Sequence, residues 1–387
     1  MIPLSYNLRS ILRRRFSAVA TAGGLGLVVF VFAADLMLAQ GVEETLKATG
    51  SPRNAIVLRK GSSTEVTSLV SREAAKVFSA DPAVAVVGGK AVASPELFVV
   101  FQLPRADGNG TANVGFRGIT SDGLQLLRSE TIKVIEGRVP QPATSELMIG
   151  QALLGRYKGA APGQSVRIAR RDWQVVGVFQ ARGSGFESEV WGDADQLIDA
   201  SHRPGYSQLT VRLKSPSELA SLRATIDANP AYTVEAKRED LYYEDASGQL
   251  ASFVRTLGKV IGFFFAFGAT LGAMITMYAQ VASRVREVGT LRALGFRRRA
   301  VLGSFLVESL ILALIGAVAG CALASLLGTV SFSTVNFSSF TEIKFRFHFE
   351  PAIAVKATIF AVLMGLLGGL LPAVRAARLP IAEATKG

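Results

Sequence analysis

The side chains that most often carry catalysis or bind metal ions are scarce in this sequence. Its 387 residues include two histidines, His202 and His348, and one cysteine, Cys321. Neither histidine has a His or Cys partner at the spacing of a metal ligand set, and a single cysteine allows no disulfide within the chain. We therefore predict no catalytic or metal site. Cys321 lies in an apolar run and is expected to pack as a small apolar side chain.

A nucleotide site is not predicted either. The stretch Gly88-Gly89-Lys90 ends like a phosphate-binding loop, but it lacks the upstream glycine and no Ser or Thr follows the lysine. Segment 41–250 carries 24 acidic and 24 basic residues, a balance that is typical of a solvated surface. We thus expect no cofactor to be bound directly by this chain.

The positive charge of the chain is concentrated rather than spread. The net charge is +12, yet segment 41–250 is balanced, so the excess lies mostly in three short segments beside apolar runs. These segments are 1–16 with four Arg, 283–300 with six Arg and one Glu, and 375–387 with three basic residues. This pattern is typical of the cytoplasmic flanks of membrane helices rather than of a nucleic-acid surface. A lipid membrane is therefore the expected partner, and nucleic acid is not.

Four apolar runs are long enough to cross a bilayer as helices, which takes roughly 20 residues each. Because arginine-rich flanks stay in the cytoplasm, both termini and segment 283–300 are predicted to be cytoplasmic. The fold class predicted is a membrane protein of four transmembrane helices with a large α+β extracytoplasmic domain between the first two. The predicted spans are 17–39, 251–282 (a stalk and the second span), 301–329 and 352–374; the extracytoplasmic parts are 40–250 and 330–351; the cytoplasmic parts are 1–16, 283–300 and 375–387.

The first apolar run has an alternative interpretation as a cleaved signal peptide. The run is about twice the usual length of a signal core. Met37-Leu38-Ala39 also has a bulky residue at the outer position of a cleavage site. A retained span is therefore favoured.

The domain predicted between the first two spans contains two β-α-β units that bracket a middle block. Segments 54–60 and 207–214 have strand patterns, and segments 68–80 and 215–229 have helical patterns. Ser215 and Glu218 have the spacing of a capping box. We predict an outer subdomain from about 45–104 and 206–240, and an inserted subdomain from about 105–205 rich in glycine and short strands.

The segment after the second span combines an apolar seam with arginines. Its apolar residues follow each other at intervals of four, three, three and three, which predicts one seam on a helix that continues the second span for about three turns. Gly295 is placed to end that helix with a left-handed cap. The seam consists of Val281, Val285, Val288, Leu291 and Leu294, and the residues off it include Arg284, Arg286, Glu287 and Arg292.

Two interpretations of this segment remain open. A simple positive anchor explains the arginines but leaves five apolar residues in register on a segment that faces water. A docking helix for a partner explains both, because such a seam is normally buried against another surface. We favour docking.

The third predicted span carries one acid and a row of small residues. Glu308 lies about two turns into the span, where it could pair with the arginines below it or cap a partner helix; a structural role is favoured over proton relay because no second acid lies at its depth. Gly316, Gly320 and Ala324 recur every four residues, a face that allows close helix approach. Packing within the same four-helix unit is favoured over a dimer seam.

These motifs resemble a known family. The pattern R-E-x-G-x-L-R-A-L-G at Arg286 to Gly295, followed by Glu308, is similar to the permease domain shared by the MacB, LolC/LolE and FtsX families of ABC transporter subunits. Segment 371–384 resembles the end of that domain, and segment 119–179 resembles the middle subdomain of MacB-like permeases. The resemblance covers nearly the whole chain and is greatest to MacB-like permeases without a fused ATPase.

The resemblance implies a non-catalytic subunit in the bacterial inner membrane that works with a separate ABC ATPase, which binds ATP and Mg. It also implies a second permease copy: a homodimer is favoured and a heterodimer stays open. A periplasmic adaptor and an outer-membrane channel are further possible partners. The favoured function is ATP-driven export of a lipophilic or peptide substrate, coupled through segment 284–295. The alternatives are lipoprotein extraction of the LolC/LolE kind and FtsX-like control of a cell-wall hydrolase.

Overall fold

The computed structural model describes residues 4–335 and 341–379. The chain forms two compact units. The first, here the helical unit, comprises residues 1–40, 252–330 and 346–387; the second, here the α/β domain, comprises 41–251 and 331–345. The predicted tail 375–387, with Lys386, falls largely outside the described residues, as does part of the predicted loop 330–351.

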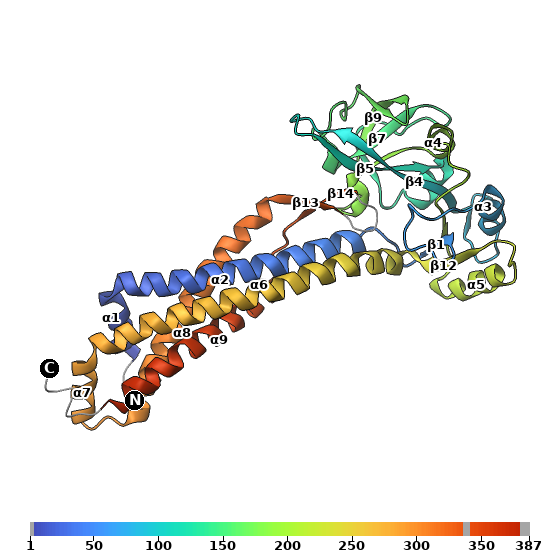
Figure 1. Ribbon diagram of the computed structural model, residues 1–387. Coiled ribbons are helices and arrows are strands. Elements are labelled where there is room, and N and C mark those ends of the chain that lie inside the picture. The colour runs from blue at the N-terminus through green and yellow to red at the C-terminus, as the bar shows by residue number, and fades with distance from the viewer. Residues whose placement is uncertain (1–3, 336–340, 380–387) are drawn as a thin grey trace. The chain divides into compact units, whose positions relative to one another are not determined.

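Long helices dominate the helical unit (Figure 1). The four long apolar helices have the length and composition of membrane spans, over Arg15–Val42, Thr256–Ser283, Arg298–Thr329 and Pro351–Arg378. They correspond to the four predicted spans and extend beyond them, because a helix can continue past the end of its apolar run. The helices that enter this unit are α1 (Leu4–Arg13), α2 (Arg15–Lys47), α6 (Glu239–Ser283), α7 (Val285–Ala293), α8 (Arg298–Leu326) and α9 (Pro351–Arg378).

Small residues bring these helices close together. A Cβ atom on Gly316 would lie 2.8 Å from the carbonyl oxygen of Ala22, and one on Gly320 would lie 2.5 Å from that of Gly26. Ala324 is fully buried. The row of small residues in the third span is thus packed against α2 within the same unit, which is the packing that the sequence favours. Helix α8 also lies along α9 (Figure 1).

The α/β domain is built on one mixed sheet. Its ten strands run in the order β12-β1-β11-β4-β5-β10-β7-β9-β6, and β8 pairs with β9. The strands of this sheet are β1 (Asn54–Arg59), β4 (Ala93–Pro104), β5 (Thr111–Ile119), β6 (Lys133–Gly137), β7 (Glu146–Gly150), β8 (Ser165–Ile168), β9 (Arg171–Gln180), β10 (Glu189–Asp193), β11 (Gln208–Arg212) and β12 (Val234–Arg238). The other elements are α3 (Arg72–Ser79), α4 (Ala194–Ser201), α5 (Leu219–Asp227), and the hairpins of β2 (Val86–Val87) with β3 (Lys90–Ala91) and β13 (Ser331–Val335) with β14 (Glu342–Arg346).

Strand β4 joins the two predicted subdomains. Its first residues, 93–96, pair with β11, and its remaining residues, 97–104, pair with β5. The strands of the predicted outer block therefore fill one end of the sheet and those of the inserted block fill the other. Since one strand serves both blocks, they form a single compact unit rather than two separate bodies.

Both faces of the sheet are covered. Successive residues of β1 alternate between two apolar cores: Ala55 and Val57 lie in one, and Ile56 and Leu58 lie in the other. Strand side chains alternate between faces, so a strand buried on both sides has a continuous apolar sequence. The second core also contains Tyr242 and Tyr243 from the first turns of α6. The start of α6 is thus part of the domain.

Two local predictions are wrong in detail. The helix predicted over 68–80 begins at Arg72, because the Ser71 hydroxyl caps it by accepting a hydrogen bond from the Ala74 amide at 3.1 Å. The predicted capping box at Ser215 does not form. The Ser215 hydroxyl pairs with that of Ser217 at 2.7 Å, and the Glu218 amide donates to the Ser215 carbonyl in a 3₁₀ turn before α5.

Candidate functional site

The most unusual feature of the α/β domain is a group of buried ionic side chains, here the buried charge cluster. Arg117 on β5 is fully buried, and it donates to Glu189 at 2.8 Å and to Glu96 at 3.0 Å. Arg128 is 2% exposed and donates to Glu239 at 2.6 Å and to Glu96 at 3.0 Å. The members are Arg117, Arg128, Glu65, Glu96, Glu189 and Glu239.

Burial and the two arginines act in opposite directions on the pKa values of Glu96 and Glu189. Burial alone would raise the pKa of Glu96, but Arg128 and Arg117 outweigh burial and hold that pKa below its usual value. For Glu189 burial dominates and raises the pKa despite Arg117. Glu189 is therefore more ready than Glu96 to hold a proton.

The buried charge cluster fastens the start of α6 to the sheet. Glu239 is the first residue of α6, and its second carboxylate oxygen accepts from the Ser51 amide at 3.0 Å and from Asn54 at 2.8 Å. One turn later, the Tyr243 hydroxyl donates to Glu65 at 2.8 Å. The beginning of α6 and the chain that leaves α2 are therefore held at one point of the domain.

A close backbone approach reinforces this junction. Gly50 follows α2 at the surface of the first turn of α6, and a Cβ atom added to it would lie 2.5 Å from the Cα atom of Asp240. Thr49 accepts a hydrogen bond from the Gly185 amide at 2.9 Å. Only glycine fits at position 50, since any other residue would push α6 away from the domain.

The hairpin between α8 and α9 is attached to the same domain by a second ionic group, here the Glu342 clip. The carboxylate of Glu342 on β14 accepts from Arg105 and from the Tyr157 hydroxyl, each at 2.9 Å, and also from Arg156. The Lys344 amide donates to Ser188 at 3.1 Å. Segments that follow α2, precede α6 and connect α8 with α9 are thus all anchored in the α/β domain.

Hydrogen bonding makes the Glu342 clip sensitive to acid. Burial would raise the pKa of Glu342, but hydrogen bonds from Ser333 and Tyr157 and the charge of Arg156 outweigh burial and lower it below 4.5. Burial and Glu342 together raise the pKa of Tyr157 to about 12. The pKa of Glu342 is lower in the folded state than in the unfolded state. The ionised carboxylate therefore contributes its full stabilisation when the pH is above the unfolded-state pKa, and this stabilisation is lost as the pH falls through the folded-state pKa.

We predict that Glu342→Gln loosens the hairpin at neutral pH as acid does for the native chain. The amide cannot satisfy two guanidinium groups, so the open state should become more populated. Trypsin should cleave after Lys344 roughly tenfold faster in this variant, because the rate of proteolysis is proportional to the population of the open state. Mass spectrometry of the fragments measures this rate. Glu130→Gln, which removes a solvent-exposed partner of Arg212, is the control. Equal cleavage rates for Glu342→Gln and the native chain would contradict the clip.

The segment between α6 and α8 departs from its predicted continuous helix. Helix α6 ends at Ser283, and α7 starts anew at Val285. Between them Arg284 has φ −115° and ψ 14°, outside the helical range. Its side chain is only 4% exposed. The break turns this guanidinium inward, where it has ionic partners.

Arg284 joins three segments of the helical unit. It donates to Glu308 on α8 at 2.7 Å and to Glu287 at 3.0 Å, and it lies over the rings of Tyr6 and Phe305. Burial would lower the pKa of Arg284, but Glu308 outweighs burial and raises it. Of the two roles that the sequence leaves open for Glu308, the structure shows the pairing with an arginine of segment 283–300, namely Arg284.

The apolar seam is divided between the interior and the surface. Val281 and Val288 are buried with Phe305, Val285 and Leu291 are partly buried, and Leu294 is 72% exposed. The prediction of one continuous seam is therefore wrong. With 3.6 residues per turn, each step of three falls short of a full turn by about 60°, so residues at this spacing wind around the helix.

The remaining residues of the segment, Arg286, Arg292 and Gly295, differ in their exposure and role. Arg286 is exposed, whereas Arg292 is partly buried and donates to the Ala377 carbonyl at 3.0 Å near the end of α9. The predicted left-handed cap is confirmed: Gly295 has φ 92°, and its amide donates to the Arg292 carbonyl. The Phe296 amide donates to the Leu291 carbonyl, which completes a Schellman motif.

Sequence inspection missed the buried charge cluster and the Glu342 clip. The balanced charge of segment 41–250 indicates a solvated surface, an interpretation that is wrong for these residues. A local signal does exist, because Arg117 lies among apolar residues and glycines in segment 114–119. Among residues 4–335 and 341–379, no group of His, Cys, Asp and Glu has an arrangement that could hold a metal ion.

The four long apolar helices, with the large α/β domain between the first two, fit a multi-pass membrane protein. Two family models match the chain: the MacB-like periplasmic core domain over residues 18–229, and the FtsX-like permease C-terminal domain over residues 259–381. The chain therefore belongs to the MacB/FtsX-type permeases of ABC transporters.

Curated relatives support the same family. The macrolide export ATP-binding/permease protein MacB of Nitrobacter winogradskyi is 30% identical over 261 residues, which are 62% of this chain and 38% of the relative. MacB of Pasteurella multocida is 27% identical and is matched over 74% of this chain and 45% of its own. The pyoverdine export ATP-binding/permease protein PvdT of Pseudomonas syringae pv. tomato is 28% identical over 58% of this chain and 34% of its own length. The chain thus spans less than half the length of these relatives.

Among solved structures, the periplasmic region of MacB from Actinobacillus actinomycetemcomitans matches 55% of this chain and 97% of its own length. It has 13% identity and a TM-score of 0.36.

Proposed function

We propose that this chain is the permease subunit that couples ATP hydrolysis by a separate ATPase subunit to motion of its α/β domain. In this proposal the segment Arg284–Gly295 and both termini face the cytoplasm, the membrane is the bacterial inner membrane, and the α/β domain is periplasmic. Two permease copies act together. The motion drives export of a lipophilic or peptide substrate, with an adaptor and an outer-membrane channel beyond the membrane.

The observation that carries this proposal is the continuity of α6. It is one helix of 45 residues from Glu239 to Ser283, about 67 Å of helix at 1.5 Å per residue. Its first residue is held in the buried charge cluster, and its last residue adjoins Arg284. A displacement of the segment Arg284–Gly295 would therefore act on a helix whose other end is fixed to the sheet.

The exposed surface of α7 and its C-cap residue Leu294 has the composition of a contact with a partner. Leu294 is a large apolar side chain at the surface, and the neighbouring Arg286 and Thr290 are exposed and polar. An exposed apolar residue surrounded by polar ones has the composition of a small contact with a partner. Behind this face, Val288 and Arg284 fasten α7 to the helical unit, so that force on α7 would pass to the spans.

We predict that Leu294→Asp weakens binding of the ATPase subunit. A carboxylate would have to be desolvated in the contact, which should lower affinity at least about tenfold. The measurement is recovery of the ATPase with the tagged permease from membranes, together with permease-stimulated ATP hydrolysis. The permease itself should insert normally, because the side chain is 72% exposed.

Two matched variants separate this effect from misfolding. Val288→Asp places the same charge in a buried position of α7 and should reduce the yield of folded permease. Val87→Asp changes a 57% exposed side chain of the β2–β3 hairpin and should alter neither yield nor ATPase recovery. Undiminished ATPase recovery with Leu294→Asp would overturn the coupling role of α7.

Export is favoured over lipoprotein extraction and over control of a cell-wall hydrolase because the relatives matched here carry export in their names. Neighbouring genes give a separate test. An ATPase gene beside adaptor and outer-membrane channel genes supports export, whereas a second permease gene with a lipoprotein carrier would contradict it.

A further inference from the structure

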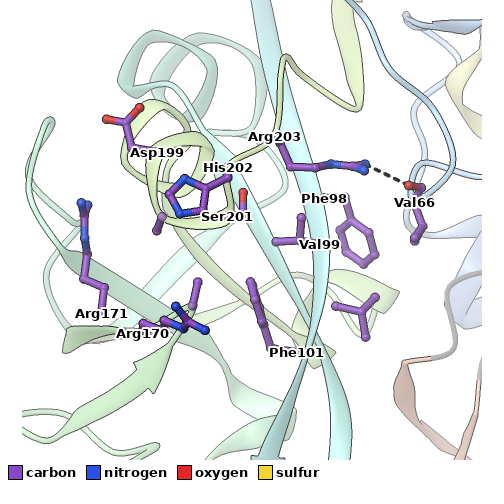
Figure 2. Close-up of a pocket in the computed structure, with 13 residues that line it drawn as sticks. Val66, Phe98, Val99, Phe101, Arg170, Arg171, Asp199, Ser201, His202 and Arg203 are labelled. Carbon is purple, nitrogen blue, oxygen red and sulfur yellow. Dashed lines mark hydrogen bonds between the residues drawn. The ribbon is translucent and has the colours of Figure 1, made fainter.

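The α/β domain contains a cavity of about 580 Å³ that none of the junctions above uses (Figure 2). Four consecutive residues of β4, Phe98 to Phe101, supply its apolar wall. The turn between β8 and β9, the end of α4 and the residue Arg203 supply the rest. Its volume lies in the range of small-molecule sites, which combine apolar walls with a few polar groups.

The polar groups of this cavity are mainly cationic. Arg170, Arg171 and Arg203 line it, against one carboxylate, Asp199. Arg171 is held by Gln196 at 2.7 Å, and Arg203 donates to the Val66 carbonyl at 2.9 Å (Figure 2). The Nε atom of Arg203 is buried and has no hydrogen-bond partner among the described residues. Arg170 is exposed and makes no hydrogen bond or ion pair within the described part of the chain.

The backbone at the cavity is strained. Ala169 and Arg170 have φ of 50° and 62° in the two-residue turn that connects β8 with β9. Such turns favour Asn-Gly, because both central residues need positive φ. His202 also has φ 53°. Of the five described non-glycine residues with positive φ, these three line the cavity, and strain of this kind gathers at ligand-binding segments.

We propose that this cavity binds a small amphipathic anion: one carboxylate, sulfate or phosphate group on an apolar chain or ring. The guanidinium groups take the anionic end by charge-assisted hydrogen bonds, and Val99 and Phe101 take the apolar end. The inference deepens the proposed function by naming the class of molecule that the domain handles, and it rests on that function for the ligand's role.

Direct binding tests the proposal on the full chain in phosphatidylcholine nanodiscs without ATP, by calorimetry with empty discs as the reference. Octyl phosphate and octanoate should bind. Inorganic phosphate and neutral octanamide should each bind about tenfold more weakly, because phosphate lacks the apolar chain and octanamide lacks the anionic group. Equal affinity for octanoate and octanamide would overturn the proposal.

Two variants of one turn separate recognition from structure. Arg170→Gly relieves the backbone strain and removes the charge, so the melting temperature should rise while affinity for octyl phosphate falls about tenfold. Ala169→Gly relieves the adjacent strain and keeps the charge, so it should also raise the melting temperature but leave affinity unchanged. Native affinity in Arg170→Gly would overturn the proposal.

The anion could be a lipid headgroup or a soluble amphiphile. Repeating the titration in phosphatidylglycerol nanodiscs distinguishes them: weaker octyl phosphate binding assigns the cavity to lipid, and unchanged binding assigns it to soluble molecules. Both outcomes support an amphipathic anion. The binding experiment contains neither ATP nor the ATPase. A failure to bind the anion would therefore not contradict the coupling role that Leu294→Asp tests, and a failure of the Leu294→Asp prediction would not contradict anion binding.

Discussion

Replacing Arg117 with alanine is expected to destabilise the α/β domain by about 3–5 kcal/mol, the usual cost of removing one partner from a buried ionic group. Arg117 contacts Glu65, Glu96 and Glu189 at 2.8–3.1 Å and is fully buried. Without it, Arg128 is the only arginine left in the buried charge cluster, beside four carboxyl groups. Those groups must then be buried with less compensation or take up protons.

Intrinsic fluorescence measures this effect selectively. The chain has two tryptophans, Trp173 and Trp191, and both lie in the α/β domain. Trp191 donates to Glu189 at 2.8 Å, so it also reports on the cluster itself. Urea titration of the variant should show a tryptophan transition at markedly lower denaturant.

Arg53→Ala is the matched control for Arg117→Ala, since it removes an exposed ion pair with Glu130 in the same domain. Little change is expected for it, because water compensates an exposed charge. A transition of Arg117→Ala that coincides with the native one would show that the cluster contributes no stability.

Gly316→Leu is expected to destabilise the helical unit by about 1–3 kcal/mol through overpacking. The first atom of the new side chain would lie 2.8 Å from the Ala22 carbonyl oxygen and 3.0 Å from the Gly26 amide nitrogen. Both are backbone atoms, so a side-chain rotation cannot relieve the clash and α2 must move away from α8.

The single thiol of the chain provides the measurement. Cys321 lies on α8, five residues from the substitution, and is partly buried against the α2, α8 and α9 core. Heating in the presence of a thiol-reactive fluorophore should give a lower transition temperature for Gly316→Leu. Gly303→Leu is the control on the same helix, because nothing lies within 4 Å of its Cβ position. Equal effects of the two variants would exclude the close α2–α8 contact as the cause.

Patterns that are local in sequence could be predicted, and patterns that depend on distant partners could not. Each apolar run is long enough to identify its span by itself, and Gly295 marks the end of α7 because few other residues adopt positive φ. The buried charge cluster, in contrast, joins Arg117 to Glu65 across 52 residues and Arg128 to Glu239 across 111 residues. Composition cannot distinguish such pairs from charges that face water.

Segment 284–295 shows the same limit at short range. The sequence places Arg284 and Arg286 alike off the apolar seam, yet Arg284 is buried and Arg286 is exposed. The difference depends on where the helix breaks, and that break places Arg284 beside Glu308, 24 residues later in the chain. The residue types of the site were thus predictable, but not which of them point inward.

The division of the α/β domain between two stretches of chain has a consequence for biosynthesis. Residues 41–251 leave the ribosome long before β14 is made, so Arg105, Arg156 and Tyr157 must wait for Glu342. By then the segments of the first three spans have been translated. The α/β domain can therefore be completed only after the third span has been synthesised, and a nascent chain arrested before residue 331 lacks the contacts of Glu342.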